Sequence, residues 1–204
     1  MRRLKNRRGE EVNELVPLAL VDRCKSGDEA AWKELVESTY REVYSLCLRI
    51  LRDPDDAAEA TQDAYLKAWR GLKGFRGDAL FTTWLYRVAS NAAISKQRKR
   101  KRTWEHEMGS EDDQLTHIPA IESTEQVAGA RLELRAVEAA LALLPEHYRS
   151  AIVLRDVYGL SIDEMAKQLG ISETAAKVRL HRARKRLKEM VYTNNADEGS
   201  EDKR

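Results

Sequence analysis

The chain has 204 residues, of which 34% are charged and 42% hydrophobic, with only 10 Gly and 4 Pro. This length accommodates one large or two small domains, and the composition favours a soluble helical protein. The net charge of +2 argues weakly against a nucleic-acid partner, but the charge is segregated into blocks, and that distribution favours one.

Cysteine usage and hydropathy exclude two further classes. Cys24 and Cys47 are far apart and belong to no CxxC pair, so neither a disulfide framework nor a zinc site is expected. The basic start is followed by an apolar run, Leu15 to Val21, that is short and broken by Pro17, which argues against a signal peptide. No apolar run approaches the length of a membrane span. We therefore expect a cytoplasmic protein with no membrane insertion of its own.

The first half of the chain contains start and stop signals for four helices. Residues 1–14 form a basic N-terminus that we expect to be disordered. A short helix is predicted from Pro17 to Lys25, and Asp28 then caps a long helix. The apolar positions of that helix recur at spacings of three and four: Trp32, Leu35, Val36, Val43, Cys47 and Ile50. Asp53-Pro54 marks its end, because a residue before proline avoids the helical region.

The third and fourth predicted helices flank a glycine-bearing loop. The third runs from about Asp55 to Arg70 and stops at Gly71, and the loop spans Leu72–Ala79. The fourth starts near Leu80 and carries a core stripe of Phe81, Trp84, Leu85, Val88 and Ala92. Its far end, Lys96–Arg102, reads K-Q-R-K-R-K-R.

The third helix begins with a group of carboxylates, Asp53, Asp55, Asp56, Glu59 and Asp63. These side chains fit a helix start favoured by the macrodipole and a solvated face. A metal or catalytic site would need a calcium-type loop or an accompanying base, which the segment lacks. A docking face for a basic partner is the more informative alternative.

One aromatic residue lies off the predicted core stripe. Phe75 lies in the glycine-flanked loop, between Lys73 and Arg76. Such a ring can stack on an unpaired base or tuck under the loop, and the sequence leaves both readings open.

The second half of the chain begins after a predicted acidic linker, residues 103–123, which has no Lys or Arg. Ser123 can open a helix whose apolar face is Val127, Ala130, Leu134, Val137, Leu141 and Leu144. Pro145 suits the first turn of the next helix, which ends by Gly159. The predicted fold is all-α, with two small helical domains at 15–102 and 124–191, and a disordered tail at 192–204.

A helix-turn-helix is predicted between residues 161 and 187. Ser161 and Glu164 form a capping box, Gly170 stops the short helix, and Ser172 can cap the next one. On a helical wheel, Ala176, Leu180, Ala183 and Leu187 form the buried side. The outward face and its flanks are rich in cations, which suits phosphates and base edges of DNA. A solvated cationic helix in an ordinary bundle is the alternative, and a lone His181 gives no metal site.

Both halves together resemble the extracytoplasmic-function (ECF) class of bacterial RNA polymerase sigma factors. The resemblance lies in P-D-D-A-A-E-A-T-Q-D-A-Y-L-K-A-W from Pro54 to Trp69 and in F-R-G-D-A-L-F-T-T-W-L-Y-R-V-A-S-N from Phe75 to Asn91. These motifs are followed by L-P-E, L-R, G-L-S, E-M-A, L-G-I-S and R-A-R in order. The chain departs from the family pattern at Asp63, Tyr65 and the T-A-A-K-V-R-L of its last helix.

The resemblance implies three sets of site residues. The set for docking on the polymerase clamp helices is Asp55, Asp56, Glu59, Gln62 and Asp63. The set for the minus-ten element is Lys73, Phe75, Arg76, Asp78, Arg87, Asn91, Lys96 and Arg98. The set for the minus-thirty-five element is Arg155, Ser172, Thr174, Lys177, Val178, Arg179, His181, Arg182, Arg184 and Lys185.

The resemblance further implies a non-enzymatic initiation factor that uses no cofactor and no metal. Its partners would be core RNA polymerase (clamp helices and flap), promoter DNA and an anti-sigma factor. A free-standing helix-turn-helix regulator is the main alternative, but it leaves the motifs at 54–91 unused. An enzyme acting on nucleic acid is the second alternative, and only the carboxylates at 53–63 would serve it.

Overall fold

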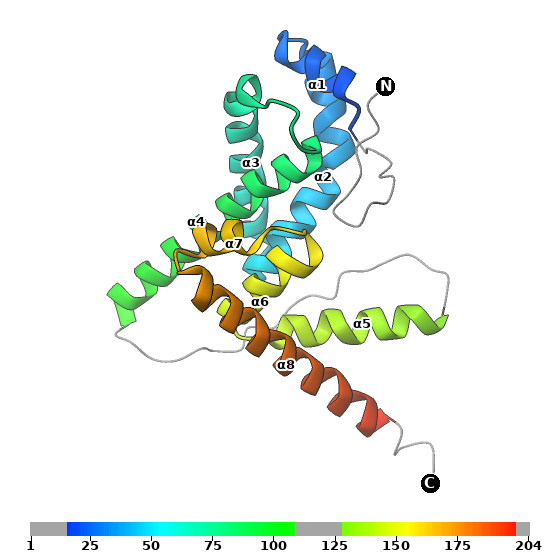
Figure 1. Cartoon of the computed structure of the whole chain (residues 1–204), viewed down its shortest axis with the longest axis vertical. Helices are drawn as coiled ribbons and strands as arrows, with labels where there is room; N and C mark the ends of the chain where they lie inside the picture. Colours follow the sequence, from blue (N-terminus) through cyan, green and yellow to red (C-terminus); the bar gives the residue numbers. More distant parts are fainter. Residues whose placement is uncertain (1–15, 109–127, 199–204) are drawn as a thin grey trace. The chain divides into compact units, whose positions relative to one another are not determined.

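The computed structural model describes residues 16–108 and 128–198, and every regular element in these two ranges is helical (Figure 1). The chain divides into two compact units, Met1–Lys101 and Arg102–Arg204. The predicted all-α fold with two helical units is thus confirmed. The basic N-terminus, residues 109–123 of the predicted linker and the Ser123 cap lie outside the described residues.

The first unit begins with α1 (Leu18–Lys25) and the long helix α2 (Glu29–Leu51). Asp28 caps α2 as predicted, since its carboxylate accepts a hydrogen bond from the backbone N–H of Ala31 at 2.9 Å. This bond is the largest cause of the lowered pKa of Asp28. At the other end Arg52 takes a left-handed φ of 59°, so α2 ends at Leu51, two residues before the predicted Asp53-Pro54 break.

Helix α3 (Pro54–Gly71) is capped by Asp53, whose carboxylate accepts from the N–H of Asp56 at 2.8 Å. Asp53 itself has the extended backbone expected before a proline. One 3₁₀ turn, η1 (Leu72–Gly74), opens the predicted loop, and Gly77 carries the positive φ of 78° that lets the loop reverse.

Helix α4 (Phe81–Met108) extends six residues beyond the predicted limit at Arg102, into the segment expected to be linker. Its first half buries Phe81, Leu85, Ala89 and Ala93. Further along, the Gln97 amide and the Arg100 guanidinium donate to the carbonyls of Ile50 and Leu51 at 3.5 and 3.4 Å. These bonds satisfy carbonyls at the end of α2, which have no partner within their own helix.

A buried hydroxyl pair joins α2 and α3. Thr39 donates to the carbonyl of Leu35 at 2.7 Å, and the Tyr65 hydroxyl lies 2.8 Å from Thr39 Oγ1, which leaves Tyr65 as the donor in that bond. Tyr65, one of the departures from the family pattern, is therefore accommodated by a polar partner.

We expect Tyr65→Phe to lower the free energy of unfolding by about 1 kcal/mol, the net value of such a bond. Burial raises the pKa of Tyr65 from 10.0 to about 12. The unfolded chain therefore releases this proton first, and the wild type should lose stability as the pH rises from 10.0 to about 12. Urea denaturation of both proteins across this range tests the prediction. An equally steep loss in Tyr65→Phe would contradict it.

The second unit begins with α5 (Ala128–Leu143) and α6 (Glu146–Ile152). Leu141 and Leu144 of the predicted apolar face are buried, but Leu134 and Val137 are exposed, so that face is only partly core. Beyond α6 the chain widens into a π-helical turn, η2 (Val153–Val157), which the sequence did not predict. Gly159 follows with a φ of 71°.

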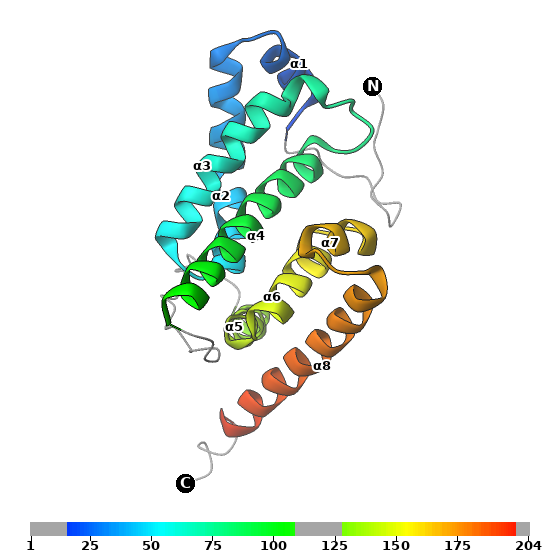
Figure 2. The ribbon, with the colours of Figure 1, turned by 90° about the vertical axis from the view of Figure 1, so that its left-hand side faces the viewer.

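The helix-turn-helix is formed by α7 (Ile162–Leu169) and α8 (Glu173–Glu198), which lies along α6 in Figure 2. Both halves of the predicted capping box are present: Ser161 accepts from the Glu164 N–H, and Glu164 accepts from the Ser161 N–H. Gly170 turns the chain with a φ of 63°. Helix α8 continues to Glu198, whereas the sequence predicted a disordered tail from residue 192.

None of the helices among the described residues combines the length and the apolar character that a bilayer crossing requires.

Candidate functional site

The acidic start of α3 does not present its carboxylates to one side. Asp55, Gln62 and Asp63 are exposed, and Asp63 lies 4.0 Å from Lys67 on the same helix. Asp56, by contrast, is turned toward α4 and keeps only 20% of its side chain exposed. The predicted docking set therefore divides into an outward part and a part engaged inside the unit.

That inner part forms ion pairs with the basic run of α4. Lys96 Nζ lies 3.2 Å from Asp56 and also bonds the Glu59 carboxylate, while Arg100 Nη1 lies 3.2 Å from Asp56. The hydrogen bond from Lys96 lowers the pKa of Glu59, and the same bond raises the pKa of Lys96. Two residues predicted to meet polymerase thus pair with one predicted to meet DNA.

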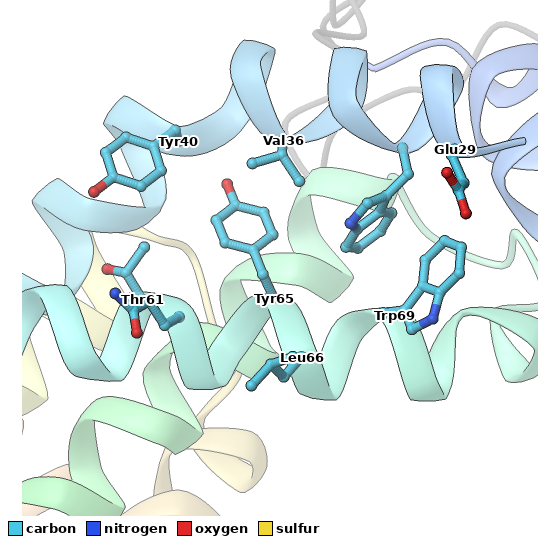
Figure 3. Close-up of a pocket in the computed structure, with 9 residues that line it drawn as sticks. Glu29, Val36, Tyr40, Thr61, Tyr65, Leu66 and Trp69 are labelled. Atoms are coloured by element: carbon cyan, nitrogen blue, oxygen red, sulfur yellow. The ribbon is translucent and has the colours of Figure 1, made fainter.

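An apolar groove lies between α2 and α3 (Figure 3). It holds about 610 Å³ and is lined by Glu29, Trp32, Val36, Tyr40, Thr61, Gln62, Tyr65, Leu66 and Trp69. Tyr40, Leu66 and Trp69 are among the most exposed large apolar side chains in the described residues, and Leu66 is 54% exposed. The sequence analysis missed this groove, although Leu66 and Trp69 lie inside the quoted motif and off the buried stripe.

In the structure the Phe75 ring is tucked under the loop, which is the second of its two predicted positions. The ring is 6% exposed and meets Phe81 and Trp84 edge-on or tilted, with centroids 5.4 and 5.6 Å away. Lys25 of α1 lies over the other side, 5.4 Å from the ring centroid. Phe75 therefore anchors the loop, and its expected stacking on an unpaired base does not agree with this packing.

The other residues of the predicted minus-ten set lie on the loop and along α4. Four are exposed on the loop or nearby on α4: Lys73, Arg76, Asp78 and Asn91. Arg87 is half-buried and Arg98 is exposed. The loop thus presents polar side chains while the buried Phe75 ring holds it in place.

The recognition helix α8 has the two sides that the wheel predicts. Ala176, Leu180 and Ala183 are buried, Leu187 is partly buried, and Val178 is 44% exposed. Seven further residues of the predicted DNA set are exposed: Ser172, Thr174, Lys177, His181, Arg182, Arg184 and Lys185, with Arg179 partly exposed. Ser172 accepts from the Ala175 N–H at 3.2 Å, so it caps α8 as predicted.

Two arginines of that set are engaged within the unit. Arg184 donates to both oxygens of Asp156, with its Nε 2.9 Å from Oδ2, and this hydrogen bonding raises the pKa of Arg184. Arg155 donates to the carbonyl of Leu160 at 2.6 Å. Arg155 thus holds the turn between α6 and α7, and Arg184 fixes α8 to η2. The sequence alone predicted neither contact.

A shallow depression on the outward face of α8 includes residues that the sequence analysis missed. It holds about 530 Å³ and is lined by His147, Tyr148, Ser172, Thr174, Ala175, Val178, Arg179 and Arg182. His147 and Tyr148 come from the start of α6, with ring centroids 4.1 Å apart. Only the fold brings them beside α8, so no local pattern could have identified them.

Within the described ranges, no three His, Cys, Asp or Glu side chains gather where they could hold a metal ion. Cys24 and Cys47 are both buried and free.

Two family models match the chain, one in each unit. The model described as Sigma-70 region 2 matches residues 35–103, and the model described as Sigma-70, region 4 matches residues 134–187. The first match contains the acidic start of α3, the loop and most of the groove lining, but not Glu29 and Trp32. The second contains the helix-turn-helix.

Curated relatives cover most of the chain. The RNA polymerase sigma-H factor of Pseudomonas aeruginosa is 34% identical over 174 residues, which are 82% of this chain and 90% of that protein. The ECF RNA polymerase sigma factor SigM of Mycobacterium tuberculosis is 36% identical over 170 residues, 83% of this chain and 82% of that protein. SigW of Bacillus subtilis, also an ECF sigma factor, is 30% identical over 176 residues, 84% of this chain and 94% of that protein.

Solved structures of similar fold agree with these relatives. The sigma factor RpoE of Bartonella quintana, in complex with the anti-sigma factor NepR, matches with a TM-score of 0.56 and 25% identity over 78% of this chain and 96% of that one. CnrH, in complex with the cytosolic domain of CnrY, matches with a TM-score of 0.52 and 26% identity over 86% of this chain and 96% of that one. The chain therefore belongs to the sigma-70 family of RNA polymerase sigma factors, in the extracytoplasmic-function class.

Proposed function

We propose that this chain binds core RNA polymerase in the cytoplasm and directs it to promoters, using α3 and its groove for polymerase and the loop and α8 for the two promoter elements. The observation that carries the proposal is that each of the two matched units has a surface suited to one partner. The first unit has an apolar groove with acidic residues, and the second has a cationic helix in a helix-turn-helix. No catalytic step by the chain is needed.

The polymerase-docking surface is proposed to be the groove with the outward residues of α3. An apolar centre with a charged rim is the usual anatomy of a specific protein interface. Leu66 and Trp69 supply the centre, and Asp55, Gln62 and Asp63 supply the rim. Asp56 is left out of this surface because α4 already engages it.

The minus-ten element is proposed to bind at the loop between α3 and α4. Extruding a base from the duplex costs a few kcal/mol, which a fixed and shape-specific pocket can offset. The buried ring of Phe75 fixes the loop, Arg76 and Asp78 are exposed on the loop, and Asn91 is exposed on α4. Asn91 has both a donor and an acceptor for the edge of a base.

We expect Asn91→Ala to reduce promoter opening more than closed-complex binding. Its side chain is exposed, so the substitution should leave the unit folded. Permanganate reactivity of unpaired thymines measures opening, and an electrophoretic shift on duplex DNA measures binding. Equal losses in both assays would point to a plain phosphate contact instead.

The minus-thirty-five element is proposed to bind along the outward face of α8 in the major groove. Val178, His181 and Arg182 lie where base edges would be read, and Lys177 and Lys185 lie where phosphates would pass. His147 shares the depression with Val178 and Arg182, so we add it to this interface. Arg184 and Arg155 serve to position the helix through Asp156 and Leu160.

We expect His181→Ala and Arg182→Ala to relax selectivity at one base pair each, at a cost of about 1–3 kcal/mol on the preferred base. Lys177→Ala should instead weaken all sequences alike and lower the salt slope by about one unit. Binding across single-base variants of the minus-thirty-five element measures both effects. If the His181 and Arg182 variants lose activity uniformly, the helix docks differently.

Two further partner contacts follow from the family and from exposed apolar residues. Leu134 and Val137, one turn apart on α5, are exposed in a unit whose family binds the polymerase flap. An anti-sigma factor is the expected regulator, because two similar structures contain RpoE with NepR and CnrH with CnrY. Such a partner would cover these docking surfaces until it is released.

Co-elution with purified core polymerase on size exclusion separates this proposal from a free-standing regulator. A sigma factor should elute with core polymerase in the absence of DNA. A free-standing regulator should bind duplex DNA and elute apart from core polymerase.

A further inference from the structure

The ion pairs between α3 and α4 join two residues of the predicted docking set, Asp56 and Glu59, to Lys96 of the predicted minus-ten set, and the following inference rests on the proposed function. Lys96 and Arg100 are four residues apart on α4 and therefore share a face. That face meets the first turns of α3, where Asp56 and Glu59 are three residues apart. Asp56 lies between the two cations, at 3.2 Å from each.

The geometry resembles a phosphate held between two cations. A carboxylate, like a phosphate, accepts charge-assisted bonds on more than one oxygen. Asp56 uses both of its oxygens, Oδ1 toward Lys96 and Oδ2 toward Arg100. Helix α3 also directs its positive end at this place, which stabilises the carboxylates there.

The pairs differ in their exposure to solvent. Asp56 and Lys96 keep 20% and 22% of their side chains exposed, whereas Glu59 and Arg100 keep 61% and 44%. Exposed pairs are weak and are screened by salt. Glu59 and Arg100 can therefore exchange their ion-pair partners, while the inner pair and the bond from Arg100 to the Leu51 carbonyl hold the arrangement in register.

Helix α4 does not depend on these pairs for its position. Its first half is anchored by the buried Phe81 and Leu85, and Gln97 donates to the carbonyl at Ile50. The ion pairs can therefore open without detaching the helix.

We propose that Asp56 and Glu59 occupy the DNA-phosphate positions of Lys96 and Arg100 in the free protein, so that polymerase docking on α3 and DNA-backbone binding on α4 strengthen each other. A basic group of polymerase that pairs with Glu59 leaves Lys96 with Asp56 in place of two carboxylates and so favours exchange of Lys96 onto a phosphate. A phosphate that pairs with Lys96 releases Glu59 for polymerase. The coupling is equal in both directions, as linkage requires.

The first test measures DNA binding by the full chain without polymerase. The variant is Asp56→Asn with Glu59→Gln, and the matched control is Asp55→Asn with Asp63→Asn, which removes the same charge from the same helix but does not touch Lys96 or Arg100. Fluorescence anisotropy on mixed-sequence single-stranded and duplex DNA is recorded over a salt series. We expect about tenfold tighter binding by the variant, with a salt slope steeper by about one to two units, because each released cation adds a phosphate contact. The control should show a smaller gain and an unchanged slope.

A permanent structural clamp predicts a different result. It predicts that the variant binds DNA no tighter than the control at any salt concentration, and this outcome overturns the proposal. If the double variant loses helicity, the single variant Glu59→Gln is measured instead and compared with Asp55→Asn. This substitution should not unfold the helix, because the Glu59 side chain is largely exposed. A slope no steeper than that of Asp55→Asn then overturns the proposal.

The second test measures the reciprocal effect on polymerase. Lys96→Met frees Glu59 and should tighten binding to core polymerase about threefold, whereas Lys33→Met, an exposed lysine of α2 paired with Glu37, should not. Equal affinities of the two variants contradict the exchange. If the wild type does not bind polymerase, the proposed function fails, while the DNA measurement still reports on the ion pairs.

Discussion

Phe75→Ala should lower the free energy of unfolding of the first unit by about 3–4 kcal/mol, as truncation of a buried phenylalanine does. The ring is 6% exposed and lies among Phe81, Trp84 and the Lys25 ammonium. Urea denaturation followed by tryptophan fluorescence measures the change, since Trp32 and Trp84 both lie in this unit. Promoter opening should fall as well, because the loop loses its anchor.

Two controls separate an anchoring ring from a base-stacking ring. Phe75→Leu keeps most of the apolar volume and should recover most of the stability. Arg76→Ala, at the exposed neighbouring position, should change stability by no more than about 0.5 kcal/mol. A Phe75→Ala protein that is as stable as the wild type but fails to open promoters would show that the ring leaves the core to meet DNA.

Leu66→Arg should weaken binding to core polymerase about thirtyfold or more, the loss expected at the centre of an interface. The side chain is 54% exposed at the edge of the α2–α3 groove, so a charge there meets no internal clash. In a docked complex, the same charge would be buried against the partner without a counter-charge. Surface plasmon resonance with immobilised core polymerase measures the affinity.

The matched control for this prediction is Val157→Arg. Val157 is 48% exposed, belongs to the second unit and is not among the residues that line the groove. Thermal melting of both variants should stay near the wild-type value. Equal polymerase affinities for Leu66→Arg and the wild type would remove the groove from the docking surface.

Local signals made much of the fold predictable. Three of these signals act within four residues of the helix end that they define: the Asp28 cap, the Ser161–Glu164 capping box and the Gly170 turn. They can therefore be predicted from the local sequence alone. The buried side of α8 also followed from helical spacing. In contrast, the π-helical turn at Val153–Val157 has no residue signature and escaped prediction.

The candidate sites were predictable in residue type but not in partner. The sequence shows that Asp56 is acidic and Lys96 basic, yet they are 40 positions apart, and only the packing of α4 on α3 brings them to 3.2 Å. The same holds for Arg184 with Asp156, and for His147 beside Val178. A charged side chain that the sequence assigns to an external partner can therefore already be paired with another side chain of the same protein.

Run-off transcription with purified core polymerase on a genomic promoter library tests the central claim most directly. The account predicts that transcripts starting at defined sites appear only when the chain is added, and that their templates share a minus-ten and a minus-thirty-five element. Arg182→Ala should relax the sequence preference at the minus-thirty-five element. Asn91→Ala should reduce the yield of transcripts without changing that preference. If core polymerase with the chain gives the same transcripts as core polymerase alone, the chain does not direct initiation and the account is contradicted.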